Sequence, residues 1–235
     1  MRIAVISDLH IGTHARSDTF QHAPAAFERF LDALEDDHDH IVLLGDVYQC
    51  DHGWSPKNSR RELAKARARS TWLTRRLEQP HYTLVHGNHD AILRQEGVPT
   101  EIWMGREDPF PTLLIHGDSF DPVIQRAPGV SGLATWASGR IRSAGLRPIA
   151  QWLEDRDIEI KGQRLQTPGG PYVRGARERM RREGARRVVM GHTHIPWCHT
   201  VAEGIILNSG TCCRGKRMFA SVDTITGESR SVPCA

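Results

Sequence analysis

Five short apolar runs in this chain each lead into side chains that can bind a metal ion. The runs read as buried strands and cover residues 2–7, 40–45, 81–86, 112–116 and 187–191. The polar residues at their ends are Asp8, His10, Asp46, Asn88, His89, Asp90, His116, His192 and His194. In open α/β sheets the carboxyl ends of the strands line the ligand crevice. The sequence therefore predicts that the five strand ends converge on one site.

The segments between and after these runs carry helical and β patterns. A helix is expected to begin at Pro24, and its buried face is expected to hold Phe27, Phe30, Leu31 and Leu34. One long basic helix is expected over residues 59–79, and short β runs over 197–201, 204–207 and 218–225. Because helices alternate with strands and a β meander closes the chain, we expect an α/β sandwich with a mixed sheet or two packed sheets.

Residues 118–184 differ from the rest because they carry no strand pattern. Helices are expected near 130–144 and 149–155, and an Arg-rich helix over 173–184 follows the sequence TPGGP. We therefore expect a single domain over residues 1–235 with a helical cap inserted at about 118–184. The apolar residues of the cap either line a cleft for a lipid tail or form the packing face of two helices. They are Trp136, Trp152, Leu133, Ile141, Leu146 and Ile149.

The composition indicates a globular protein without a covalent scaffold. The 235 residues have a formal net charge of +3, which permits anionic substrates without requiring nucleic acid. No run reaches the ~18 apolar residues of a membrane span, and the N-terminal run is too short for a secretory signal. The five cysteines form no CxxC pair, so neither a disulfide framework nor a thiolate zinc site is expected. These features predict a cytoplasmic protein.

The strand ends supply a donor set of two carboxylates, one amide and four imidazoles. Its members are Asp8, Asp46, Asn88, His10, His116, His192 and His194. Such a set is too large for one ion and suits two, with a carboxylate between them. Mixed nitrogen and oxygen donors favour Mn²⁺, with Fe or Zn²⁺ as alternatives. Two divalent ions roughly 3.5–4 Å apart form a clamp for in-line attack at phosphorus.

The ordered motifs DLH (8–10), GD (45–46), GNHD (87–90), HGD (116–118), GHTH (191–194) and NSGT (208–211) resemble those of the calcineurin-like metallophosphoesterase superfamily. The resemblance implies a four-layer αββα sandwich with a dinuclear metal site. It assigns one ion to Asp8, His10, Asp46 and His194. It assigns the other to Asp46, Asn88, His116 and His192, so that Asp46 bridges the pair. His89 matches the acid that protonates the leaving oxygen, and the resemblance has Asp90 orient it.

Within the superfamily, the helical cap and the HGDSFD and GHTHIP sequences look most like the UDP-2,3-diacylglucosamine pyrophosphohydrolases. One departure is that this branch typically has Arg where this chain has His89, which favours a broader phosphodiesterase. We expect hydrolysis of a phosphodiester or pyrophosphate bond. The alternatives are a cyclic-nucleotide or general phosphodiesterase or a phosphomonoesterase; a nuclease and an inactive scaffold are less favoured.

The same interpretation predicts the partners of the chain. A small phosphorylated substrate is expected, with lipid contact through the cap at the inner membrane as an option, and nucleic acid is not expected. His14 and His52 lie in loops near the predicted crevice and are candidates for substrate contact. The sequence leaves the oligomeric state open.

Overall fold

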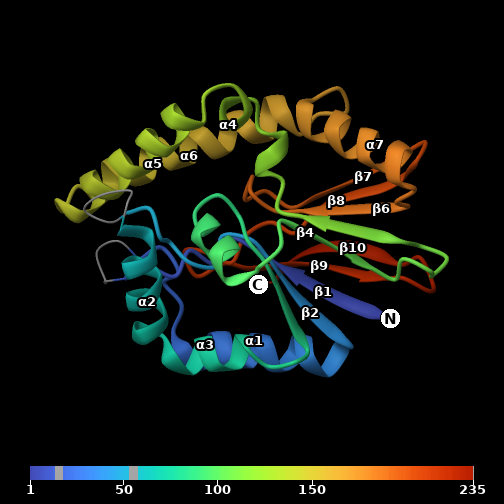
Figure 1. The fold of residues 1–235 in the computed structure, drawn as a ribbon, viewed down its shortest axis with the longest axis horizontal. Helices are drawn as coiled ribbons and strands as arrows, with labels where there is room; N and C mark the ends of the chain where they lie inside the picture. The colour runs from blue at the N-terminus through green and yellow to red at the C-terminus, as the bar shows by residue number, and fades with distance from the viewer. Residues whose placement is uncertain (14–17, 53–57, 235) are drawn as a thin grey trace.

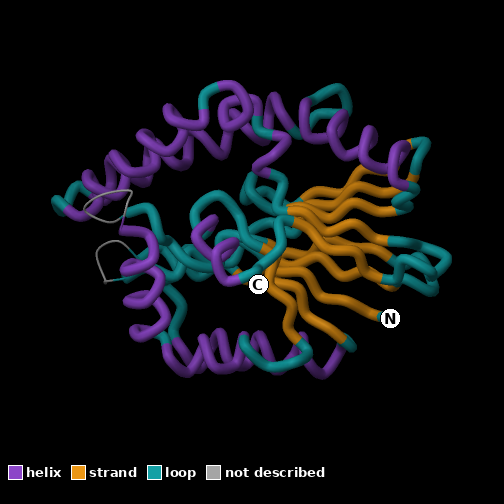
Figure 2. Tube along the Cα trace, in the orientation of Figure 1, coloured by secondary structure: helices purple, strands orange, loops and turns teal. Residues whose placement is uncertain are grey.

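The computed structural model describes residues 1–13, 18–52 and 58–234, and its strands form two five-stranded sheets (Figures 1 and 2). The first sheet has the order β10-β9-β1-β2-β3 and the second the order β4-β5-β6-β8-β7. The first comprises β1 (Arg2–Ile6), β2 (His40–Leu44), β3 (Tyr82–Val85), β9 (Arg217–Asp223) and β10 (Ser229–Cys234). The second comprises β4 (Glu101–Met104), β5 (Thr112–Ile115), β6 (Arg187–Met190), β7 (Trp197–Val201) and β8 (Gly204–Asn208).

Parallel pairing places the strand ends that precede the candidate site residues at the same edge of the sandwich. β1 pairs in parallel with β2, and β2 with β3. In the second sheet β5 pairs in parallel with β6, and β6 with β8. The remaining pairs are antiparallel. The residues that follow β1, β2, β3, β5 and β6 therefore all leave the sandwich at one edge.

The two sheets pack face to face through one buried layer of aliphatic side chains. The first sheet contributes Ile3, Val5, Val42, Leu44 and Val85, and the second Leu114, Val189 and Leu207. Side chains alternate across each strand, so the residues between these face outward and need a second cover. This explains why the strands are apolar on both faces.

Helices provide that cover on each side of the sandwich. α1 (Pro24–Asp37), α2 (Ser59–Arg69) and α3 (Thr71–Leu77) lie on the side of the first sheet. α7 (Pro171–Glu183) covers the second sheet with Tyr172, Val173, Ala176 and Met180. The short helices η2 (Ala91–Glu96) and η3 (Asp118–Phe120) follow β3 and β5. The four-layer sandwich expected from the family resemblance is therefore confirmed.

Three elements differ from the sequence expectation. The long helix over 59–79 is two helices, because Ser70 has φ −118° and ψ 49° and ends α2 before α3 begins. Serine competes for backbone hydrogen bonds and favours helix ends over helix interiors. The strands β4 and β10 were not expected. Each is a sheet-edge strand, so its partner across the sheet, and not its own pattern, defines it.

The expected insertion is helical, but its last helix packs on the sandwich and is not part of the cap. The cap helices are α4 (Pro122–Arg126), α5 (Pro128–Ser143), α6 (Arg147–Ile160) and the π-helical η4 (Lys161–Leu165). They extend beyond the strand edge and over the loops that leave it (Figure 1). α7 instead belongs to the outer layer of the sandwich. Among the described residues no helix is both long and apolar enough to cross a membrane.

Candidate metal centre

The strand ends of both sheets meet in three overlapping groups of metal-competent side chains. One group is Asp8, His10 and His194, another is Asp46, His116 and His192, and the third is His10, Asp46 and His89. Within each group the ligand atoms all lie within 4.8 Å of one another. His10 and Asp46 each appear in two groups, so the three groups form one continuous cluster. The structure thus brings together the expected aspartates and histidines.

The backbone at these residues is held in an uncommon conformation. Asp8, His10, Asp46, His192 and His194 have φ values of 55°, 51°, 53°, 66° and 61°. Positive φ is rare for residues other than glycine, and such strain gathers at functional sites. These five residues follow β1, β2 and β6 and are among the metal-competent side chains. The backbone therefore marks the same site as the side-chain chemistry.

Two glycines make room for the ligands. Gly45 has φ 84°, and a Cβ atom there would lie 2.3 Å from His116 Nδ1. Gly87 has no positive φ, but a Cβ atom there would lie 2.2 Å from Asp46 Oδ1. Gly87 is therefore needed for the space that it leaves beside Asp46 and not for backbone rotation.

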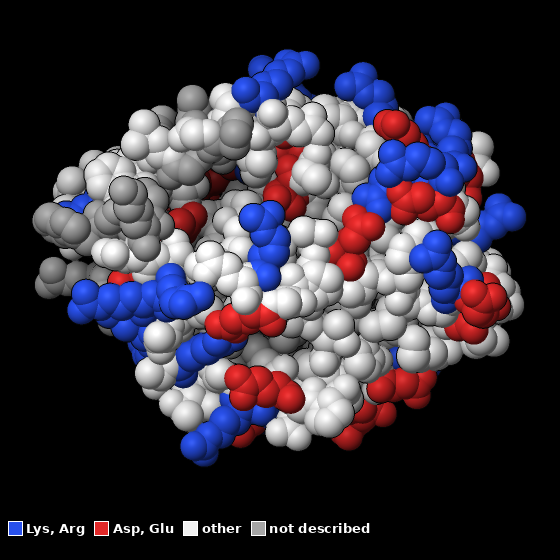
Figure 3. All heavy atoms as spheres, viewed as in Figure 1, with Lys and Arg blue, Asp and Glu red and all other residues white. Residues whose placement is uncertain are grey.

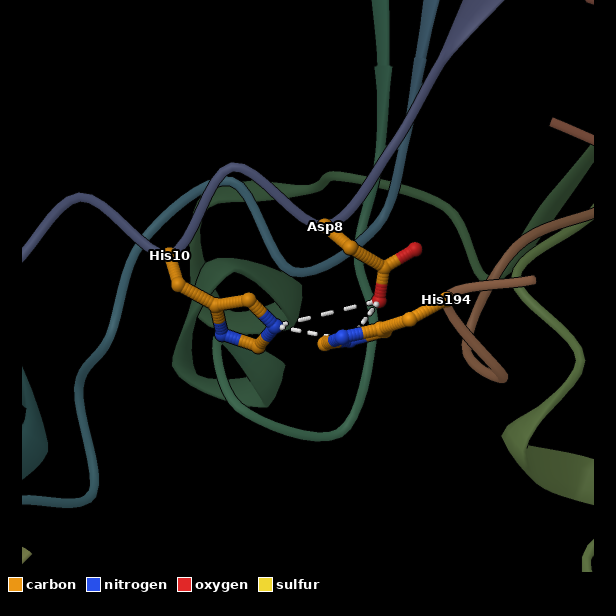
Figure 4. Close-up of side chains that lie close together, drawn as sticks. All are labelled: Asp8, His10 and His194. Carbon is orange, nitrogen blue, oxygen red and sulfur yellow. Dashed lines mark hydrogen bonds and ion pairs between the residues drawn. The ribbon is translucent and has the colours of Figure 1, made fainter. Parts of the chain in front are cut away.

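The first group has its nitrogen and oxygen atoms turned toward one another (Figure 4). His194 Nε2 lies 3.1 Å from Asp8 Oδ1 and 3.2 Å from His10 Nε2. His10 Nε2 lies 3.8 Å from Asp8 Oδ1. The other Asp8 oxygen accepts hydrogen bonds from Ser7 Oγ and from the His192 backbone N–H. Asp8 is thus fixed by one oxygen and presents the other to the two imidazoles.

Unpartnered buried atoms test whether these residues fit a metal. Asp8 Oδ1, Asn88 Oδ1 and His116 Nε2 are buried and have no hydrogen-bond partner. Buried polar atoms in folded proteins are nearly always paired, so each orphan calls for an explanation. His116 Nε2 lies 3.2 Å from Asp46 Oδ2, and Asn88 lines the same cavity as Asp46. These atoms fit bound cations, which would give each of the three a partner.

Three of the imidazoles are oriented through the ring nitrogen that lies away from the cluster. His10 Nδ1 contacts Gln49 Oε1 at 2.8 Å, and His116 Nδ1 contacts the Leu44 carbonyl oxygen at 2.8 Å. His192 Nε2 contacts the Asp121 carboxylate at 3.1 Å. If these nitrogens donate, the opposite ring nitrogens keep lone pairs for a cation, as is usual for metal-binding histidines. Sequence reasoning gave no role to Gln49 or Asp121, although Asp121 ends the HGDSFD sequence that follows β5.

His89 has a different orienting partner from the one expected. His89 Nδ1 lies 2.9 Å from Asp51 Oδ2 and 2.8 Å from Gln49 Nε2. Its Nε2 atom lies 3.9 Å from Asp46 Oδ2. Burial alone would lower the pKa of His89, but Asp51 and Asp46 raise it to about 9. At neutral pH His89 can therefore carry a proton beside the metal-competent cluster.

The expectation that Asp90 orients His89 was wrong. The Asp90 carboxylate accepts hydrogen bonds from the backbone N–H groups of Gly87, Val47 and Tyr48, at 2.7, 2.7 and 3.2 Å. It therefore ties the loop after β3 to the loop after β2. Burial and the nearby Asp46 raise the pKa of Asp90 to about 7. Its role is to hold the backbone that carries Asn88 and His89.

A cavity of about 480 Å³ joins the metal-competent residues to the cap helices. Figure 3 shows a hollow under these helices with acidic side chains inside it. The apolar wall consists of Val123, Ile124, Ala134, Ala137, Ile141, Leu153 and Ile158. Of the apolar residues expected to line a cleft, only Ile141 does so; Trp152 is 59% exposed on the outer face. His52 also lines the cavity, whereas His14 lies outside the described residues.

A four-layer sandwich with clustered aspartate and histidine side chains at its strand ends is the architecture of a metal-dependent hydrolase. The model of the calcineurin-like phosphoesterase family matches residues 1–196. The chain therefore belongs to this family and is a metal-dependent phosphoesterase. The family resemblance drawn from the sequence is confirmed.

Named relatives share most of the chain at low identity. The UDP-2,3-diacylglucosamine hydrolase of Shewanella halifaxensis is 26% identical over 216 residues, with 87% of each chain covered. That of Shewanella baltica is 26% identical over 220 residues, with 87% of this chain and 86% of its own covered. Among solved structures, Vps29 from Chaetomium thermophilum has a TM-score of 0.49 and 11% identity, covering 99% of this chain and 95% of its own.

Proposed function

We propose that the protein hydrolyses a phosphodiester or pyrophosphate bond in a substrate that carries acyl chains, of the UDP-2,3-diacylglucosamine type. The observation that carries this proposal is the shared cavity, which is lined at one end by Asp46, His192 and His194 and along one wall by aliphatic side chains. A small aryl or cyclic ester would leave this apolar wall in contact with water. An acyl chain would cover it. The names of the curated relatives support the same substrate class.

We propose two divalent ions at the site, with Mn²⁺ first and Fe or Zn²⁺ as alternatives. Asp8, His10, Asp46 and His194 would hold one ion. Asp46, Asn88, His116 and His192 would hold the other, with Asp46 between them. When bound, the ions would supply a hydroxide nucleophile and neutralise charge on the phosphoryl oxygens. The orienting contacts to Gln49, Leu44 and Asp121 would keep the imidazoles aligned for this task.

His89 is the general acid in this proposal. An alkoxide leaving group needs a proton, which His89 can donate from Nε2 because Asp51 holds its Nδ1. Asp51 also stabilises the imidazolium, so the proton is present on His89 at neutral pH. The residue that orients the acid therefore comes from the loop after β2 and not from the GNHD motif.

The outer face of the cap helices supports contact with a lipid surface, at the cytoplasmic side of the inner membrane. Leu133, Leu146, Ile149 and Trp152 are between 50% and 63% exposed there. Lone exposed apolar side chains are common, but several on one helical hairpin favour an interaction. Flotation with phospholipid vesicles, compared between the native protein and Trp152→Glu, tests this contact.

A substrate panel tests the proposed function. Metal-reconstituted protein should be compared on UDP-2,3-diacylglucosamine, an aryl phosphodiester, an aryl phosphomonoester and a cyclic nucleotide. We expect the highest kcat/KM on the acylated pyrophosphate. Equal or better activity on the unacylated diester or on the cyclic nucleotide would favour the general phosphodiesterase instead.

A further inference from the structure

Arg214 lies in the wall of the cavity, next to the metal-competent residues. It follows β8 in the NSGTCCR sequence, and its backbone N–H donates a hydrogen bond to the Thr19 carbonyl. The preceding residue, Cys213, has its Sγ atom 3.9 Å from His194 Nδ1. Arg214 therefore stands on a loop that directly adjoins one expected metal ligand, and its side chain is only 17% exposed.

Besides His89, few positively charged side chains are on the described lining of this cavity. Lys161 and Arg214 are the lysine and arginine side chains there, and several carboxylates surround them. The Lys161 ammonium lies 2.8 Å from the Asp157 carboxylate and 3.5 Å from Asp121, which in turn contacts His192. Lys161 is thus paired with Asp121, whose carboxylate orients the expected metal ligand His192. Arg214 is therefore the cation that an anionic group of the substrate can reach.

The ion pairs that Arg214 makes with its two carboxylate partners are weak. Arg214 contacts Glu154 and Asp155, both on α6. Arg142 holds both oxygens of Glu154 at 2.5 and 2.6 Å and is only 3% exposed, so it already balances that charge. Asp155 is 54% exposed, and ion pairs with exposed partners contribute little. An anion that enters the cavity can therefore replace Asp155 on Arg214 at small cost.

We propose that Arg214 forms a second anion subsite, which binds the phosphate next to the scissile phosphorus in a diphosphate substrate. The proposal rests on the proposed function, since it needs a substrate with two phosphates. The planar guanidinium suits two phosphate oxygens at once, which a lysine cannot match. Arg214 would thereby distinguish a pyrophosphate from an ester that contains one phosphorus. Its contacts with Glu154 and Asp155 would hold the guanidinium in place before substrate binds.

The test compares two substrates that differ by one phosphate, the p-nitrophenyl esters of thymidine monophosphate and thymidine diphosphate. The measured quantity is the ratio of kcat/KM for the diphosphate to kcat/KM for the monophosphate. We expect Arg214→Gln to lower this ratio roughly 10- to 100-fold, mainly through KM, as for the loss of charged hydrogen bonds. Arg214→Lys should recover only part of the ratio, because the charge remains but the fork is lost.

Asp155→Asn and Glu154→Gln provide the matched variants. If Arg214 serves only to fasten the cap to the body, all three substitutions break the same contact and lower the ratio alike, which would overturn the proposal. If Arg214 binds phosphate, the two carboxylate variants keep or raise the ratio. A native protein that hydrolyses neither these esters nor UDP-2,3-diacylglucosamine with any metal would instead refute the proposed function. An active protein whose ratio is unchanged in Arg214→Gln refutes only the subsite.

Discussion

At the residue scale, the candidate site consists of metal-ligand residues that could be predicted from the sequence and of orienting residues that could not. Asp8, Asp46 and the histidines could be predicted because each follows a strand, and strand ends meet at one edge. Asp51 and Asp121 could not be predicted in this way. Each contacts its histidine through loop geometry that no sequence period encodes. The assignment of Asp90 failed for the same reason, because proximity in sequence to His89 did not place the two side chains together.

The first residue-scale prediction concerns His89. His89→Asn should retain metal content and lower kcat roughly 10²- to 10⁴-fold on substrates with alkoxide leaving groups, the usual contribution of a general acid. The loss should be much smaller with p-nitrophenolate, which leaves without a proton. Metal analysis and steady-state kinetics on the two substrates measure this. Equal losses on both substrates would rule out the acid role.

Substitution by asparagine should affect catalysis at Asp51 and stability at Asp90. Asp51→Asn should reproduce the leaving-group dependence of the His89 variant at smaller magnitude, because the acid loses its partner. Asp90→Asn should chiefly lower the free energy of unfolding, by about 1–3 kcal/mol, because its carboxylate holds three backbone amides. Kinetics and urea denaturation of both variants check this. The opposite pattern would restore Asp90 as the orienting residue.

At the element scale, apolar strands and the amphipathic α1 are predictable, whereas edges and breaks are not. α1 begins at Pro24 and buries the four expected residues. β4 and β10 have weak patterns because each pairs along only one side. For the cap, the helices were predictable but their rotation was not. The cavity-facing side of α6 carries Leu153 and Ile158, while the neighbouring Trp152 points outward.

Adjacent residues on α6 give a matched test of the cap. Leu153→Ala should raise KM for an acylated substrate roughly tenfold, since a buried aliphatic contact is lost, and should spare small aryl esters. Trp152→Ala changes a larger side chain on the same helix but outside the cavity, so its KM in detergent solution should change little. A larger effect from Trp152 than from Leu153 would place the acyl chain on the outer face.

Glu35 joins α1 to α3 and β3 and should make stability depend on acid pH. Burial alone would raise its pKa, but hydrogen bonds from Arg76 and Tyr82 lower it from 4.5 to about 2. Because the folded pKa lies below the unfolded value, the stabilisation is complete above about pH 4.5 and is lost as pH falls toward 2. Glu35→Gln should therefore lower Tm at pH 7 and converge with the native protein near pH 2. Glu28→Gln, on the same helix, is the control; a pH-independent difference for Glu35→Gln would contradict this.

At the scale of the whole molecule, the candidate metal centre connects the two sheets. Asp8, His10, Asp46 and Asn88 come from the first sheet, while His116, His192 and His194 come from the second. Between the sheets lies an apolar core, and hydrogen bonds such as the one between His116 Nδ1 and the Leu44 carbonyl oxygen also join them. A cation bound by both sets adds a polar link at one edge. Metal binding and global stability should consequently be coupled.

This coupling can be measured by thermal unfolding with and without Mn²⁺. At a free metal concentration of 100 times Kd, binding should add about 2.7 kcal/mol, which corresponds to roughly 5–10 °C in Tm. Asp46→Asn should lose most of this shift, because in the proposed site its carboxylate is a ligand of both ions and it belongs to two of the three groups. His89→Asn keeps every expected ligand and should keep the shift. An unaltered shift in Asp46→Asn would contradict the bridging position.

The left-handed backbone at Asp8, His10, Asp46, His192 and His194 also limits which sequences can occupy this fold. Asparagine and glycine accept positive φ most readily, while β-branched residues resist it. A deep mutational scan for folded protein should therefore tolerate Asp8→Asn far better than Asp8→Val, even where activity is not selected. Loss of the metal would leave this restriction in place. Homologues that have lost catalytic activity should therefore still have small polar residues or glycine at these turns.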